Sequence, residues 1–215
     1  MASEVDIANL ALANLGDDAT VASLDPPEGS AQAEHCARFY PMARDALLEA
    51  HTWNFATKRA QLAELTSESS SWTYCYAVPS NILVAIAVLP PDVVDDYSDN
   101  STDHETAVGE YIGQPFVIES LEDGASVIYT DQEDAVLRYT ARITDPTKFS
   151  PLFTHALAWS LASMLAGPII KGDVGAAEAK RCLQMMNLHL GQAKTSDANQ
   201  RNVKPKKRVP WIAGR

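Results

Sequence analysis

The chain has 215 residues, of which 46% are hydrophobic, and a formal net charge of -11. This length can bury one substantial core but falls short of two full-sized domains, so we expect one compact unit. The acidic balance argues against a protein that grips nucleic acid over a broad surface. No apolar run approaches the roughly 20 residues of a membrane span and no signal-peptide pattern opens the chain, so we expect assembly in a cytoplasm without a membrane partner.

Two helices are predicted in the first 50 residues. Ser3, followed by two acidic residues, is a typical helix start, and the apolar stripe after it predicts a helix over about 4–15. Ser30 can cap a second helix, whose apolar side chains recur at spacings of three and four as far as Leu48. Pro41 falls inside that pattern, and the sequence leaves open whether one helix kinks there or two helices abut.

The middle of the chain has the alternation and the β-branched runs that are typical of strands. Strands are predicted over 74–78, 82–89, 127–129 and 135–143, with a hairpin over 108–119 that is broken by Gly and Pro at 113–115. The polar segment 92–105 is predicted to be a loop. These segments together predict a small antiparallel sheet.

Helical spacing returns after Asp145-Pro146. One helix is predicted to run from Phe149 to Leu165, where Gly167-Pro168 should stop it, and a last one from Asp173 to Ala193. The predicted fold class is therefore α+β: mainly an α-helical bundle formed by the N- and C-terminal helices with an inserted small antiparallel β region. The predicted boundaries are 1–55 and 145–194 for the bundle, 56–144 for the β region, and 195–215 for a basic C-terminal arm.

The charge is divided unevenly along the chain. Residues 195–215 carry six Lys and Arg against one Asp, whereas 92–137 holds thirteen Asp and Glu and no Lys or Arg. A charged terminus can be a solubilising end, but a Trp between cations, with prolines that favour an extended chain, favours a docking arm. The predicted partner-binding residues are Arg201, Lys204, Lys206, Lys207, Arg208 and Trp211.

The sequence shows no pattern of an enzyme. It has no GxSxG, no Gly-rich phosphate loop and no HExxH, and its five His are scattered. Cys36, Cys75 and Cys182 are too far apart for a zinc set and are expected to be buried free thiols. We therefore expect no catalytic residue, cofactor or metal. The alternative left open is a glycosidase, because an acidic stretch offers many carboxylate pairs.

Several segments taken in order resemble a known family, the tail tubular protein A family of adaptors in short-tailed phages (podoviruses). The match touches most of residues 5–166 and departs from the family at Thr52, at Val78 and in the acidic stretch from Asp92. The segments that carry it are Ile7–Gly16, Cys36–Leu48, His51–Ala56, Tyr74–Pro79 and Tyr139–Ala166.

This resemblance implies a structural protein of the virion at the head-tail junction. Its members form a homo-oligomeric ring, expected to be twelve-fold, beneath the portal protein, and the tail nozzle or tail-tube protein attaches to the β region. Phage DNA would pass through without specific binding, and the arm 195–215 would reach the portal or a neighbouring subunit. The rivals are a tail-associated peptidoglycan hydrolase and a terminase-like or regulatory DNA-binding module.

Overall fold

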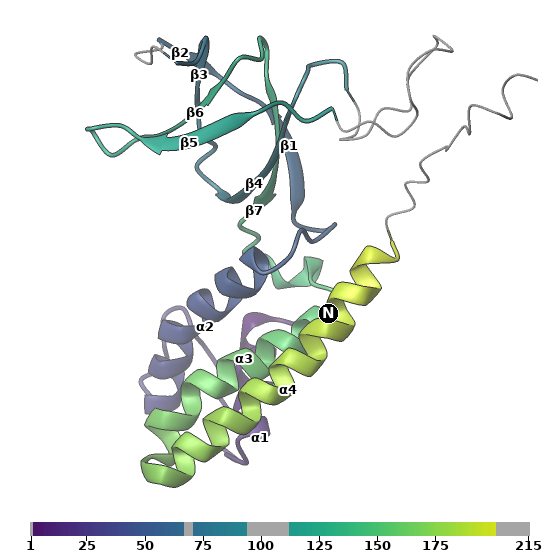
Figure 1. Cartoon of the computed structure of the whole chain (residues 1–215). Coiled ribbons are helices and arrows are strands. Elements are labelled where there is room, and N and C mark those ends of the chain that lie inside the picture. The colour runs from purple at the N-terminus through teal and green to yellow at the C-terminus, as the bar shows by residue number, and fades with distance from the viewer. Residues whose placement is uncertain (1, 67–70, 94–111, 201–215) are drawn as a thin grey trace, which may run out of the picture. The chain divides into compact units, whose positions relative to one another are not determined.

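The computed structural model describes residues 2–66, 71–93 and 112–200. They fall into two compact units, so the expectation of one compact unit is wrong (Figure 1). The helical unit consists of residues 2–56 and 142–200, and the β unit consists of the described residues within 57–141.

The predicted fold class, a mainly helical bundle with one small antiparallel β insert, is wrong. The described chain has four α-helices and seven strands, and the strands form two antiparallel sheets of three and four strands. These sheets make up a compact unit of their own rather than a small insert. The physical reason is that sheet size depends on pairing between distant segments, which local alternation does not report.

The first two helices form where their caps predict. Helix α1 spans Glu4–Asn14 and begins with a capping box, in which the Asp6 N–H donates to Ser3 Oγ and the Ser3 N–H donates to the Asp6 carboxylate. Helix α2 spans Ala31–Glu49, with Ser30 as its cap. The sequence left open whether one helix or two cover this segment, and the structure has a single helix that continues through Pro41. Pro41 is exposed, so its ring can face solvent.

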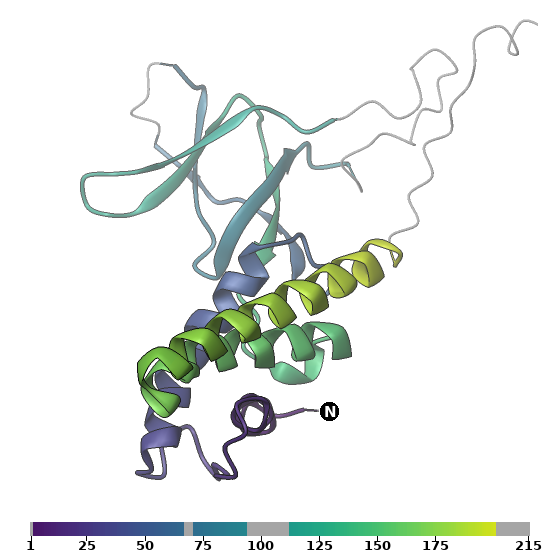
Figure 2. The same cartoon turned by 60° about the horizontal axis from the view of Figure 1, so that its bottom comes forward.

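The last two helices are longer than predicted. Helix α3 spans Pro151–Ile170 and passes through Gly167-Pro168, so the predicted stop is wrong. The proline lies in the final turn, where packing of α3 against α1, α2 and α4 outweighs one lost hydrogen bond. The chain then reverses at Lys171 and Gly172, both with a φ of 61°, and α4 spans Gly172–Ala198. In Figure 2 α1 is seen along its axis while α3 and α4 run across the view, so α1 crosses them.

Helix α3 is also long and apolar enough to cross a membrane, which the sequence analysis did not expect. Its mean hydropathy is 1.3, and half of the apolar window is buried inside the protein. Leu157, Leu161 and Leu165 are fully buried in the helical unit. The apolar composition of α3 therefore fits the central helix of a packed unit.

The β unit contains two antiparallel sheets. The three-stranded sheet has the order β1-β7-β4 and the four-stranded sheet the order β2-β3-β6-β5. The strands are β1 Thr57–Gln61, β2 Glu64–Leu65, β3 Tyr74–Ala77, β4 Ile82–Leu89, β5 Phe116–Ser120, β6 Ser126–Thr130 and β7 Val136–Ala141.

Two strand predictions change. Strand β5 pairs with β6, which follows it, rather than with a strand before it. The start of the predicted 108–119 hairpin and most of the predicted 92–105 loop fall in residues 94–111, which lie outside the described residues. Strand β1 was not predicted at all, because its sequence Thr-Lys-Arg-Ala-Gln is polar and does not alternate. It forms a strand because its backbone pairs with β7, and its side-chain pattern does not indicate that pairing.

Candidate functional site

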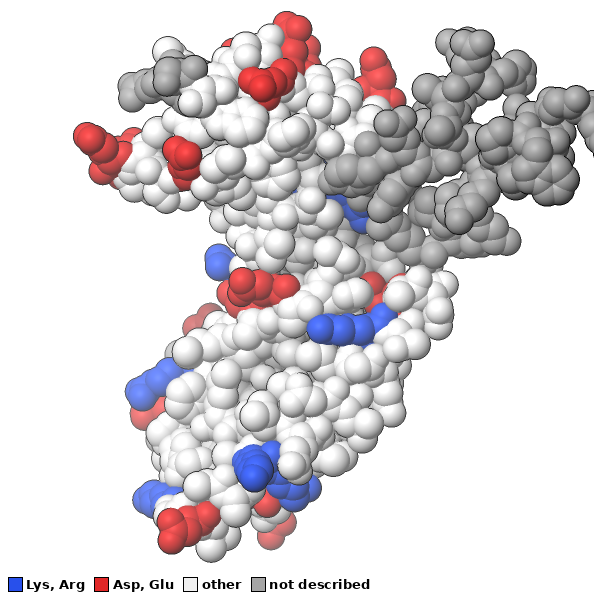
Figure 3. Space-filling model, in the orientation of Figure 1, with Lys and Arg blue, Asp and Glu red and all other residues white. Residues whose placement is uncertain are grey.

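The most distinctive surface of the helical unit is the outer side of α4. From Leu183 to its end at Ala198 this helix has no exposed charged residue, since Lys194 is half-buried and Asp197 is buried. Leu183 and Leu188 are 47% and 54% exposed. Figure 3 shows the side of the helical unit on which α4 lies, and most of that helix is free of charged groups. Long exposed helices normally carry charge on their solvent side, so this one is unusual.

The spacing of these residues is that of a helix-packing seam. Residues 184, 188, 191, 195 and 198 follow one another at intervals of four and three, which places them on one line along α4. The surface along the same side is shallow and open. We call this surface the α4 outer face, and its residues are Gln184, Asn187, Leu188, Gly191, Gln192, Thr195, Ser196, Ala198 and Asn199.

The opposite side of α4 is pressed against α3. At Gly175 an added Cβ would lie 2.9 Å from the Ala166 carbonyl oxygen, so glycine is required for the two helices to approach this closely. Cys182 and Ala193 are buried further along. Helix α4 is therefore held rigidly, with one side buried and the outer face left available for a partner.

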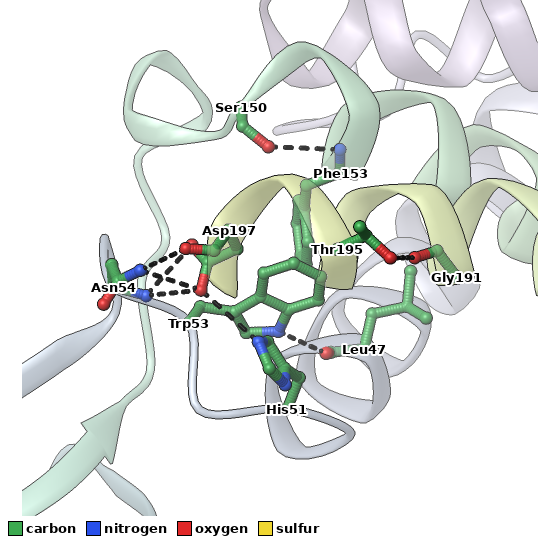
Figure 4. A network of polar contacts seen from close by, with 9 residues as sticks. All are labelled: Leu47, His51, Trp53, Asn54, Ser150, Phe153, Gly191, Thr195 and Asp197. Atoms are coloured by element: carbon green, nitrogen blue, oxygen red, sulfur yellow. Dashed lines mark hydrogen bonds and ion pairs between the residues drawn. The ribbon is translucent and has the colours of Figure 1, made fainter. Parts of the chain in front are cut away.

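A polar network holds the C-terminal end of α4 (Figure 4). The buried carboxylate of Asp197 accepts hydrogen bonds from the Asn54 backbone N–H at 3.1 Å and from Asn54 Nδ2 at 3.1 Å. Asn54 Nδ2 also donates to the Asp197 carbonyl oxygen at 2.7 Å. His51 Nε2 lies 3.3 Å from Asp197 Oδ2. The network ties the end of α4 to the segment that follows α2. Asp197 falls within the predicted arm 195–215, whose first residues, 195–198, belong to α4 instead.

An aromatic cluster packs beneath this network. Trp53 is fully buried, and its Nε1 donates to the Leu47 carbonyl oxygen at 2.8 Å. Its ring meets Phe153 edge-on, with centroids 5.0 Å apart, and Phe55 lies 5.2 Å from Phe153. Such contacts fix the segment that carries His51 and Asn54 and so position the network.

The N-terminal half of α4 is fixed by Arg181. Its guanidinium pairs with Glu178, donates to the Asn14 carbonyl oxygen at 2.9 Å, and lies 5.3 Å above the Trp159 ring. The hydrogen bonds from Arg181 lower the pKa of the Glu178 carboxyl. These contacts satisfy the cation within the helical unit, so we assign Arg181 a structural role.

Several of the scattered His and Cys have packing contacts or buried positions among the described residues. His155 and His189 stack on each other with centroids 5.8 Å apart. Cys36 and Cys182 are buried free thiols, as predicted, and burial raises the pKa of Cys36 to about 11. Within the described ranges, no group of three or more His, Cys, Asp and Glu could hold a metal ion.

The predicted partner-binding residues all lie outside the described residues, so that prediction stays untested. The α4 outer face was not predicted, although its signal, an amphipathic helix whose polar side lacks charge, was present in the sequence. No protein-family model matches this chain, and no curated protein is significantly similar to it.

Proposed function

We propose that this chain is a structural subunit of the ring-shaped head-to-tail connector of a short-tailed phage. In this role it is not an enzyme: it joins other copies of itself into a ring under the portal protein, and the nozzle or tail-tube protein attaches to the ring. The proposal follows the resemblance of residues 5–166 to the adaptor family. The twelve-fold copy number comes from that resemblance alone.

The observation that best supports the proposal is the α4 outer face. A row of small, amide and apolar side chains at helix-packing spacing suits the close approach of another helix. Ring subunits must pack side by side, and an uncharged face lets neighbouring copies of an acidic protein meet without repulsion. The rigid support from α3 keeps that face in shape before a partner arrives.

The charge of the chain suits a DNA passage. Fifteen Asp and Glu against three Lys and Arg in residues 57–141 give that region a formal charge of -12. DNA must cross a connector without sticking to it, and carboxylates repel phosphates whereas Lys and Arg would bind them. In this role phage DNA passes through without specific binding, and the protein acts in the virion after assembly in the host cytoplasm, without a membrane.

The test is assembly with purified portal protein, followed by negative-stain imaging and sedimentation. We expect rings with the native chain and none with Leu188→Lys, which places a charge in the α4 outer face. The matched control is Met42→Lys, because Met42 is 59% exposed on α2, away from that face. Rings formed equally well by both variants would remove α4 from the interface, and no ring under any condition would refute the connector proposal.

Two further measurements separate the rival functions. Deletion of residues 201–215 tests whether the arm contributes to portal binding, and undiminished binding would exclude that role. A turbidity assay on permeabilised cell walls tests for peptidoglycan hydrolysis, and clearing that is lost in carboxylate variants would favour the hydrolase. A gel shift with the arm removed tests for DNA binding, and tight residual binding would contradict an acidic adaptor.

A further inference from the structure

The open edges of the two sheets differ in how they are protected. Among the described strands, β1 and β4 lie at the edges of one sheet and β2 and β5 at the edges of the other. An unprotected edge offers backbone N–H and C=O groups to another extended chain. Charged residues, bulges and short length are the usual protections.

Three of these edges carry such protections. Strand β1 presents the exposed cations Lys58 and Arg59, and β2 has only two residues. Strand β4 has two register shifts in its pairing with β7, and Val88 near its end is bridged to Gln114. None of the three is suited to accept a basic strand.

Strand β5 has neither a bulge nor a short length, and Glu119 is its one charged residue. It has five residues in unbroken register with β6, and it pairs with no other strand in the described part of the chain. Val117 and Ile118 are 38% and 44% exposed and lie on opposite faces of the strand. The Leu121 N–H donates to the Ala125 carbonyl at 2.8 Å. In an antiparallel pair, residues that bond to the partner strand alternate with residues whose backbone groups point outward. Because Leu121 bonds to Ala125, the N–H and C=O groups of Ile118 point away from β6.

The surroundings of this edge are acidic. Glu119 on β5 and Glu122 and Asp123 in the turn that follows are all exposed. Figure 3 shows acidic side chains gathered on the β5–β6 hairpin. They belong to a region, residues 57–141, with a formal charge of -12. A strand that docks on β5 should therefore be basic.

The C-terminal arm has the matching composition. Residues 201–215 carry six Lys and Arg and no Asp or Glu. Pro205 and Pro210 bracket the four residues 206–209, which is the placement of proline tolerated in an edge strand. Fifteen residues reach at most about 50 Å when extended, far enough to leave the end of α4 and meet another molecule.

We propose that β5 receives the C-terminal arm of a second copy of this chain as an added strand. This inference rests on the proposed connector function, because a ring needs two different surfaces that join head to tail between neighbours. The backbone ladder supplies affinity, and the carboxylates around β5 select a basic segment over others. Each chain then carries both the arm and the edge that accepts it.

The experiment uses the full chain with the photo-crosslinking residue p-benzoyl-phenylalanine in place of Trp211. Unlabelled and heavy-isotope-labelled copies are mixed, irradiated and digested, and mass spectrometry locates the crosslinks. We expect crosslinks from the arm of one copy to residues 116–120 of another. Ile118→Lys should lower their yield about tenfold, because it places a cation on the accepting edge.

The matched control is Val174→Lys, since Val174 is 71% exposed in the helical unit and should leave the yield unchanged. Glu119→Lys serves as a second test should Ile118→Lys fail to fold. Crosslinks confined to one copy, crosslinks to other segments, or none at all would overturn the inference.

Sedimentation of the same samples separates the two proposals. Rings without arm-to-β5 crosslinks would overturn the strand addition and leave the connector standing. Crosslinks between copies without any ring would support the strand addition and count against the connector.

Discussion

The helical unit and the β unit differ in how their charges and their cores are arranged. Residues 1–56 and 142–200 carry thirteen Asp and Glu against eight Lys and Arg, whereas 57–141 carries fifteen against three. The helical unit packs a connected cluster of large aromatic side chains around Trp53 and Phe153. The β unit has a mainly aliphatic core, in which Leu89, Ile128 and Leu137 are fully buried.

Aromatic packing and negative charge are therefore distributed unevenly between the two units. Both units have fully buried cores, and the helical unit presents an uncharged face, which suits contacts that must be rigid. The β unit carries most of the negative charge and an open edge, which suits contacts that are electrostatic. Substitutions in one unit should therefore leave the other unit unchanged.

The largest effect is expected from Trp53→Ala. Removing this fully buried indole leaves a cavity and deletes the hydrogen bond to Leu47, so the free energy of unfolding should fall by about 3–5 kcal/mol. Hydrogen exchange followed by mass spectrometry should show faster exchange in the helical unit and little change in the β unit. Met42→Ala, at an exposed position of α2, is the control and should change stability by less than about 0.5 kcal/mol. Equal acceleration in both units would show that the two units unfold together.

Alkaline pH should weaken the helical unit through Cys36. Burial raises the pKa of its thiol from 9.0 to about 11, so the unfolded chain loses this proton first as the pH rises. The stabilisation is complete below pH 9 and is lost between pH 9 and 11, by about 3 kcal/mol at most. Denaturant titrations across this range should show a shallower pH dependence in Cys36→Ala, and parallel curves for the two proteins would contradict the assignment.

A smaller effect is expected from Asp197→Ala. The Asn54 N–H groups lose their buried acceptor, which should cost about 2 kcal/mol. Thermal unfolding measures the loss, and exchange should rise first at the end of α4. Asp197→Asn keeps an acceptor oxygen and should lose less, so equal losses in the two variants would show that hydrogen bonding is not the cause.

The smallest effect is expected in the β unit, from Tyr76→Phe. The Tyr76 hydroxyl donates to the Gln132 carbonyl at 2.8 Å while its ring is buried, so the change should cost about 1 kcal/mol. Tyr74→Phe on the same strand is the control. The faster exchange should stay within the β unit, and its spread into the helical unit would mean that the units unfold together.

Local signals in the sequence predicted the elements that have clear caps or a clear side-chain period. Ser3 and Ser30 mark the starts of α1 and α2, and the alternating and β-branched runs mark β3 and β4, because capping and side-chain period are decided within a few residues. The expected burial of Cys36 and Cys182 followed from their chemistry. The uneven charge along the chain was also readable directly.

Tertiary structure decided what depends on distant partners. Strand β1 exists because β7 pairs with it, and α3 continues through Pro168 because three helices pack against it. The second sheet, the pairing of β5 with β6 and the Asp197–Asn54 network join residues that no sequence spacing connects. The α4 outer face was visible in the sequence only as missing charge, and packing against α3 decided which side of the helix stays exposed. Strand pairing and burial depend on residues far apart in the chain, so local sequence patterns could not predict these features.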